Sequence, residues 1–296
     1  MTDLPEPVPP RGWDPRVLAF RSGSLVTVFA VLTRRWTVLV DTLYSEAGAC
    51  ELAGQALEAA HRLHGTPPPL LVVNTHADWD HAWGNAVFAG PRAAFPAPVL
   101  GTRECARRLR SAEEAAELQA ALAREPDRYA GAALVAPTLA FEGSAEIDGE
   151  DLTLHLLPAP GHKPDQVVVW IPEIGHLLAA DAAEHPMPFV EGPGHLARLV
   201  ATLEALRDLH PRKVLACHAP LDGDPALLDR NLAYFARVRA AAAAATPGTL
   251  PPEDLEEALG LPLREVAPDL PEEIRDFYRE AHRKALAAAW FERAPS

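Results

Sequence analysis

One short stretch, from Thr75 to His81, constrains the fold of this chain more than any other feature. It follows the apolar run Leu70–Val73, which predicts a buried strand, and it precedes a predicted helical turn. Imidazole and carboxylate groups are the ligands that divalent metals take where thiolate is absent. The stretch therefore predicts part of a metal site on the loop that leaves a strand, and its metal-capable side chains are His76, Asp78, Asp80 and His81.

Three more ligand-type side chains stand shortly after apolar runs elsewhere in the chain. In layered α/β folds the binding crevice lies at the carboxyl ends of the strands, so such endings can converge on one pocket. We therefore expect these side chains to complete the metal site; they are His162 after Leu154–Leu157, Asp181 after Leu177–Ala180, and His218 after Val214–Ala216.

Predicted helices and strands mix in both halves of the chain. Residues 45–64 have apolar side chains at helical spacing, and residues 102–124 predict a single polar, alanine-rich helix. This mixture predicts an α/β fold, a layered sandwich with a helical C-terminal appendage. We expect three parts: an extended N-terminal tail (residues 1–16), a main domain (residues 17–245) and the appendage (residues 250–296).

Composition and charge narrow the function classes. The net charge of −14 argues against nucleic acid as a partner, because phosphate binding needs a positive surface. No apolar run approaches the roughly 20 residues that span a bilayer, and the first residues lack the pattern of a signal peptide. The three cysteines have no metal-type spacing, which favours reduced thiols in a cytoplasmic protein. We expect a small-molecule substrate and no membrane or nucleic-acid partner, with homodimer formation left open.

Five motifs, taken together and in this order, resemble the metallo-β-lactamase superfamily, the αββα-sandwich metallo-hydrolases that include glyoxalase II-type enzymes. The resemblance implies a four-layer αββα sandwich for roughly residues 25–218 and leaves the chain after Asp224 unmatched. The motifs are Val38–Thr42, Thr75–His81, Pro160–His162, Ala179–Asp181 and Ala216–His218.

The same resemblance implies a binuclear metal site. One metal would be held by His76, Asp78 and His162, and the other by Asp80, His81 and His218. Asp181 would bridge the two metals together with a hydroxide, and Asp80 and Asp181 would be the catalytic carboxylates. Asp41 is expected outside the metal's ligands, where it would orient a ligand or the loop.

Asp78 departs from the commonest motif of the family, which has a second histidine at this position. A carboxylate makes the site harder and more anionic, which also suits iron and manganese. Two divalent ions are expected, zinc before iron or manganese.

Four side chains are candidates for substrate contact: Lys163, Glu184, His185 and Phe189. Each also has a plainer interpretation, since Lys163 suits a solvated loop and the segment from Glu184 to Phe189 suits a stiff connection to the next helix. Both interpretations stay open at this point.

The chemistry implied by these ligands is hydrolysis of a small ester, thioester, lactone or amide by a metal-activated hydroxide. An alternative is a non-hydrolytic iron enzyme, either a diiron redox protein or a thiol dioxygenase, which Asp78 motivates. A third class, a metal-stabilised binding or sensor protein, is disfavoured because such proteins are expected to have lost a ligand and none is missing here.

Overall fold

The structure is a computed structural model that describes residues 4–24, 26–91, 93–245 and 254–293. The chain divides into two compact units. Unit 1 consists of Met1–Pro158 and Asp165–Leu178, and unit 2 consists of Ala159–Pro164 and Ala179–Ser296. The predicted break between residues 245 and 250, with the first residues of the predicted appendage, lies outside the described residues.

Unit 1 contains a seven-stranded sheet with its strands in sequence order. Strands β1 to β4 pair antiparallel, and β4 to β7 pair parallel. Within the predicted N-terminal tail, the segment Glu6–Val8 pairs with β2. The strands are β1 (Glu6–Val8), β2 (Val17–Ser22), β3 (Val26–Leu32), β4 (Thr37–Val40), β5 (Leu70–Val73), β6 (Val99–Thr102) and β7 (Leu139–Phe141).

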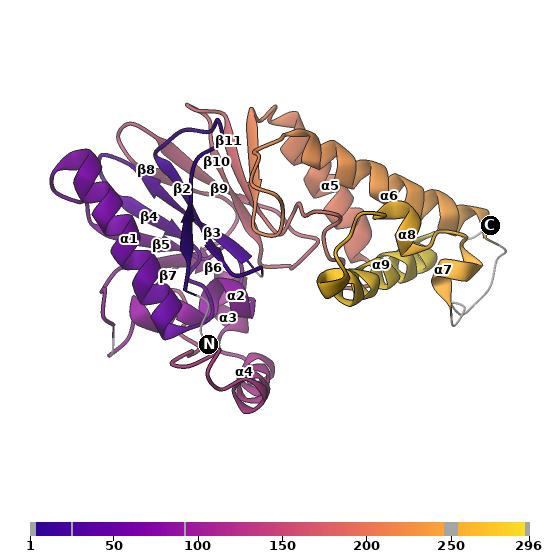
Figure 1. Cartoon of the computed structure of the whole chain (residues 1–296), viewed down its shortest axis with the longest axis horizontal. Coiled ribbons are helices and arrows are strands. Elements are labelled where there is room, and N and C mark those ends of the chain that lie inside the picture. Colours follow the sequence, from indigo (N-terminus) through magenta and orange to yellow (C-terminus); the bar gives the residue numbers. More distant parts are fainter. Residues whose placement is uncertain (1–3, 25, 92, 246–253, 294–296) are drawn as a thin grey trace. The chain divides into compact units, whose positions relative to one another are not determined.

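Helices of unit 1 connect the parallel strands. Helix α1 packs against β4 because its alanine and leucine side chains recur at helical spacing on one buried face (Figure 1). The predicted single helix over residues 102–124 is wrong in one respect, since it is divided where Ser111 caps a new helix by accepting a hydrogen bond from Glu114 N. The helices are α1 (Glu46–His64), α2 (Trp79–Ala82), the 3-10 helix η1 (Trp83–Val87), α3 (Arg103–Arg108) and α4 (Ala112–Arg124).

A second sheet begins in unit 1 with β8 (Ala145–Asp148), β9 (Thr153–Pro158) and β10 (Val167–Ile171), which pair antiparallel in that order. Strand β11 (His176–Ala180) follows β10, and the chain passes into unit 2 within β11. In unit 2 the end of β11 adjoins β12 (Lys213–Ala216), where Cys217 N donates to Ala180 O at 3.2 Å.

Unit 2 is otherwise helical, which confirms the predicted C-terminal helical region. Helices α5, α6 and α9 pack on one another (Figure 1). The helices are α5 (His195–Asp208), α6 (Ala226–Ala244), α7 (Leu255–Ala258), α8 (Leu263–Val266) and α9 (Glu272–Glu292). Across the described part of the chain, every helix is too short or too polar to cross a lipid bilayer.

The parallel pairing of β4 with β5 positions the predicted metal loop. Val40 is the register partner of Val73, so both strands end at the same level of the sheet. Asp41 leaves β4 in the left-handed region, with φ of 70°, and its N–H donates to Val73 O at 2.8 Å. The first residues after the two strands are therefore neighbours, although they are far apart in sequence.

Gly84 is expected to be intolerant of a side chain. A Cβ there would lie 2.1 Å from Thr42 O, a backbone atom that cannot turn aside. We expect Gly84→Ala to lower the free energy of unfolding by about 1–3 kcal/mol. The matched control is Gly54→Ala in α1, where a Cβ meets nothing within 4 Å, and it should raise stability by about 0.5–1 kcal/mol. Urea unfolding of both variants measures the difference, and equal stabilities would contradict this packing.

His282 on α9 should make unit 2 sensitive to acid. Its Nε2–H donates to Leu261 O at 2.7 Å and its Nδ1 accepts from Tyr234 OH at 2.9 Å, which holds the ring neutral. Burial lowers the pKa of His282 below its ordinary value of 6.5. Since the unfolded chain takes up the proton near pH 6.5 and the folded chain only at lower pH, stability should fall as pH drops below 6.5.

His282→Gln keeps a donor and an acceptor without the titration, so its unfolding free energy should fall less steeply between about pH 7.5 and 5.5 than that of the parent. His61→Gln, on the exposed surface of α1, is the control and should keep the parent slope. Identical slopes for the parent and His282→Gln would exclude this role.

Candidate metal centre

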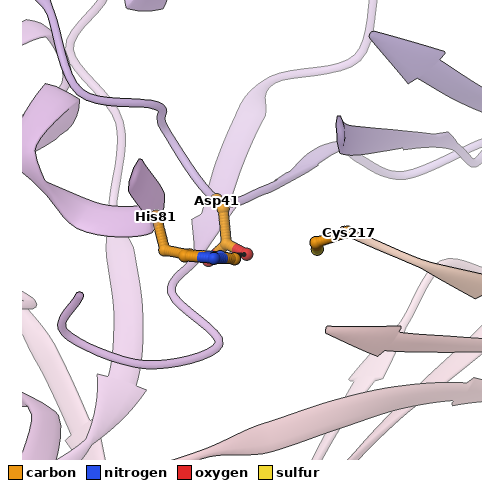
Figure 2. A group of neighbouring side chains, drawn as sticks. All are labelled: Asp41, His81 and Cys217. Atoms are coloured by element: carbon orange, nitrogen blue, oxygen red, sulfur yellow. Dashed lines mark hydrogen bonds and ion pairs between the residues drawn. The ribbon is translucent and has the colours of Figure 1, made fainter. Parts of the chain in front are cut away.

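Asp41 is the centre of the hydrogen-bond network beneath the metal loop of unit 1. Its Oδ1 accepts from Thr75 N at 2.7 Å, and its Oδ2 accepts from Thr75 Oγ1 at 2.8 Å and from His81 Nδ1 at 2.8 Å. Figure 2 shows the carboxylate and the His81 ring facing one another. Burial raises the pKa of Asp41, and the hydrogen bonds and charge of His81 oppose the shift. The side chain thus ties the end of β4 to the loop after β5.

Both histidines of this loop are oriented through Nδ1. His76 Nδ1 lies 3.0 Å from Thr75 Oγ1, and His81 Nδ1 lies 2.8 Å from the Asp41 carboxylate. An imidazole that donates through Nδ1–H carries its lone pair on Nε2. With Nδ1 held in this way, Nε2 is the nitrogen that could bind a metal ion, which is the usual arrangement of metal-ligating histidines.

A pair of buried amides closes the base of the same loop. Asn74 Nδ2 donates to Asn85 Oδ1 at 3.0 Å, and Asn85 Nδ2 donates to Asn74 Oδ1 at 2.8 Å. Thr42 Oγ1 also donates to Asn85 Oδ1, at 3.0 Å. Because both ends of the loop are fixed in this way, the ligand-type side chains between them are presented by a rigid segment.

Asp78 is held by an arginine that the sequence did not point to. Arg108, at the end of α3, donates from Nη2 to Asp78 Oδ1 at 2.7 Å and to Glu114 Oε1 at 2.6 Å, and from Nη1 to Asp165 Oδ1 at 2.7 Å. Asp165 Oδ2 in turn accepts from Ala77 N at 2.8 Å. Burial lowers the pKa of Arg108, but the charges of Asp78 and Asp165 outweigh it and the net shift is upward.

Unit 2 brings three of the predicted ligands together on its own. Asp181 follows β11 after Ala180, which has a φ of 46°, and His218 follows β12. His218 Nε2 lies 3.3 Å from Asp181 Oδ2, and His162 Nε2 lies 3.6 Å from the same oxygen. His185 N donates to His218 O at 3.0 Å and fixes the backbone of this ligand.

The loop of His162 is seated on α5. Gly161 has a φ of 139°, and a Cβ there would lie 2.4 Å from Leu199 Cα, so glycine alone allows this approach. Thr202 Oγ1 donates to Pro160 O at 2.6 Å. His162 Nδ1 lies 3.3 Å from Phe189 O, so Nε2 is again the nitrogen that could bind a metal ion.

Glu184 is a buried acid beside the ligands of unit 2. Its carboxylate, His162 and Asp181 form a group that could hold a metal ion, with ligand atoms within 4.8 Å of one another. Burial raises the pKa of Glu184 to about 7, with the negative charge of Asp181 acting in the same direction. Tyr278 OH, from α9, donates to Glu184 Oε2 at 3.4 Å.

The separations between donor atoms fit a metal ion. Two ligands of a tetrahedral zinc ion, each about 2.0–2.1 Å from it, lie roughly 3.3–3.4 Å apart. Within unit 1, His76 Nε2 and Asp78 Oδ2 are 3.8 Å apart, and His81 Nε2 and Asp80 Oδ2 are 3.6 Å apart. The pairs in unit 2, at 3.3 and 3.6 Å, are similar. These separations match ligands that share a cation more closely than they match direct hydrogen bonds.

The other candidate substrate contacts take different positions. His185 is exposed, and Lys163 Nζ lies 3.1 Å from Glu191 Oε1. Phe189 is half-buried, and its ring centroid lies 4.9 Å from that of Phe277 on α9. Sequence reasoning assigned no role to four residues that contact a predicted ligand, its loop or Glu184: Thr75, Arg108, Asp165 and Tyr278. Thr75 and Asp165 stand close to predicted ligands in the sequence, next to His76 and three residues after His162, whereas Arg108 and Tyr278 do not.

Two sheets with flanking helices and clustered histidine and aspartate side chains define an α/β protein with sites that could hold metal ions. The model of the metallo-beta-lactamase superfamily matches residues 22–218. The chain belongs to this superfamily, whose members generally bind divalent metals and are mostly hydrolases. No curated protein is similar enough to match the chain.

Solved structures confirm the predicted fold class. A metallo-beta-lactamase family protein from Thermus thermophilus is 22% identical with a TM-score of 0.58, covering 96% of this chain and 90% of its own. A metallo-beta-lactamase from Pontibacter korlensis is 20% identical with a TM-score of 0.55, covering 77% and 97%. The mono-zinc form of FIM-1 from Pseudomonas aeruginosa is 16% identical with a TM-score of 0.52, covering 78% and 95%.

Replacing Asp41 should disturb the tautomer of His81. In Asp41→Asn the new amide N–H₂ would face two donors, Thr75 Oγ1–H and His81 Nδ1–H, so the imidazole is driven to carry its proton on Nε2. We expect metal affinity to fall by about 10–100-fold. Chelator competition measures the affinity, and ¹⁵N chemical shifts of the metal-free protein report the tautomer.

The control for this variant is Asp14→Asn, whose carboxylate accepts from Arg16 and contacts no residue of the metal loop. It should leave both readouts unchanged. An Asp41→Asn protein with parental affinity and the parental tautomer would show that Asp41 does not orient His81.

Proposed function

We propose that the protein is a cytoplasmic binuclear metal-dependent hydrolase that cleaves a small ester, thioester, lactone or amide. The observation that carries the proposal is the set of donor pairs in each unit, imidazole Nε2 facing carboxylate oxygen at 3.3–3.8 Å. The family match spans all seven of these side chains, which is the reason to assign the two groups to one centre.

The ligand assignment follows the motif order of the superfamily. We assign His76, Asp78 and His162 to one ion and Asp80, His81 and His218 to the other, with Asp181 shared between them. Asp181 suits a shared position because its Oδ2 already faces two imidazoles, those of His162 and His218. Zinc is the first expectation, and the carboxylate of Asp78 keeps iron and manganese as alternatives.

Bound divalent cations would supply the nucleophile, since a water molecule on such ions has its pKa lowered from about 15.7 to about 7. The residues of the chain provide the rest. Asp41 and Thr75 hold the imidazoles of unit 1 in the metal-binding tautomer. Asp80 and Asp181 bind as carboxylates, and a second oxygen of Asp80 would accept the proton released during hydrolysis.

Substrate contacts are proposed on the side chains near the ligands of unit 2. Glu184 and Phe189 both adjoin the His162 side chain, the first through its carboxylate and the second through its backbone carbonyl. The Glu184 carboxylate belongs to the same cluster as His162 and Asp181, so it would lie beside a substrate bound there. Lys163 and His185 are proposed to act at the outer edge of the site, because His185 is exposed and Lys163 Nζ pairs with the exposed Glu191.

The test is elemental analysis of the purified full-length protein, combined with a panel of chromogenic ester, thioester, lactone, amide and β-lactam substrates. We expect about two divalent ions per chain and turnover on at least one acyl substrate. Chelation should abolish turnover, and added Zn²⁺ should restore it. His162→Ala should lose at least one ion and reduce kcat/KM by about a hundredfold or more.

The matched control is His61→Ala on the exposed surface of α1, which should keep both metal content and turnover. Stoichiometric metal without turnover on any acyl substrate would contradict the hydrolase. Iron accompanied by oxygen consumption would instead support the non-hydrolytic iron enzyme, and a protein that binds no metal would exclude both.

A further inference from the structure

Arg108 forms a cluster of buried ion pairs that the proposed function leaves unexplained. Its guanidinium forms ion pairs with three carboxylates at 2.6–2.7 Å, those of Asp78, Glu114 and Asp165. The side chain is only 15% exposed, and that of Asp165 is fully buried. All four residues belong to unit 1. Exposed ion pairs contribute little to stability, but these are buried, and buried charges require compensation.

We propose that Arg108 is a positioning residue of the metal centre, which fixes the carboxylate of Asp78 as a metal ligand. This inference rests on the proposed function. Arg108 binds Oδ1 of Asp78, and Oδ2 of the same carboxylate is the atom that faces His76 Nε2, at 3.8 Å. The two oxygens therefore have separate roles, one held by the arginine and one presented toward the imidazole.

The partners of Arg108 fix it in place. Glu114 occupies the first turn of α4, and its carboxylate accepts from the same Nη2 atom that binds Asp78. Asp165 accepts from Nη1 and also from Ala77 N, the residue between His76 and Asp78. A planar guanidinium with several donors suits this arrangement, whereas an ammonium group could not span it. The ligand loop is thus held at two points, the backbone N–H of Ala77 and the side chain of Asp78.

Charge also connects the cluster to a cation. With every group ionised, one guanidinium faces three carboxylates, so the cluster is short of two positive charges. A single divalent cation on Asp78 supplies that number. A histidine at position 78, the commoner residue in the family motif, would be neutral and would gain nothing from a nearby guanidinium. Arg108 therefore suits a carboxylate at this position better than an imidazole.

The decisive measurement is metal affinity in the full-length, metal-free protein, titrated with Zn²⁺ against a chromogenic chelator. Arg108→Met should lower the zinc affinity of the site that contains Asp78 by about 10–100-fold. The matched control is Arg16→Met, because Arg16 also bridges two carboxylates in unit 1, Asp14 at 2.8 Å and Asp151 at 2.9 Å. Arg16→Met should lower thermal stability but leave zinc affinity within about twofold of the parent.

A double-mutant cycle separates positioning of Asp78 from general support of the fold. In an Asp78→Ala background the carboxylate that Arg108 positions is gone, so adding Arg108→Met should weaken zinc binding by a smaller factor than it does in the parent. A structural role alone would produce the same loss in both backgrounds. Equal losses, or an Arg108→Met affinity within about twofold of the parent, would overturn the proposal.

Arg108→Lys covers the case in which Arg108→Met does not fold. It keeps the charge but loses the fork that reaches two carboxylates from Nη2, and an affinity loss of about tenfold is expected. Parental affinity in the lysine variant would also overturn the proposal. The two proposals fail separately: a parent protein without metal excludes the hydrolase, whereas a parent with two ions and an unaffected Arg108→Met excludes only the role of Arg108.

Discussion

The buried carboxylate of Asp41 joins two strand ends and two candidate ligands in one network. It accepts three hydrogen bonds, from Thr75 N, Thr75 Oγ1 and His81 Nδ1, at 2.7–2.8 Å. A buried charge is stable only where hydrogen-bond donors surround it. The Asp41 carboxylate therefore needs Thr75 and His81 to stay in these positions. The left-handed backbone at Asp41 has a cost of its own, which the surrounding bonds offset. The geometry of the loop from His76 to His81 depends on this arrangement.

Charge balance links this network to the chemistry of the centre. The superfamily generally binds divalent cations. Near the ligand loop of unit 1, the single guanidinium of Arg108 faces three carboxylates. Such a surplus is costly in a buried site and becomes favourable once cations are present. Asp78 adds to the surplus, whereas the histidine of the commoner motif would not. Its carboxylate is paired with Arg108 at 2.7 Å, which offsets part of this surplus.

The C-terminal helices support the ligand group of unit 2, although they lie beyond the residues that the family model matches. Glu292 at the end of α9 accepts from Gly194 N, Leu196 N and Ala197 N and so caps the start of α5. Helix α5 in turn packs beneath Gly161, next to His162. Tyr278 on α9 reaches Glu184. The predicted boundaries of this appendage stay a prediction, but its helices contribute to the candidate site rather than to a separate module.

The sequence by itself determined which strands precede ligand-type residues, because apolar runs followed by His76, Asp181 or His218 are local patterns. It also determined the superfamily, through motif order. Only the tertiary structure decided how these side chains are held. Arg108 meets Asp78 across 30 positions and Tyr278 meets Glu184 across 94, and strand register and helix packing set such contacts. Within the segment predicted as one helix, residues 102–124, the sequence does not indicate that Arg108 is the charged side chain that turns inward. Its burial depends on the carboxylates of Asp78 and Asp165, which come from other parts of the chain.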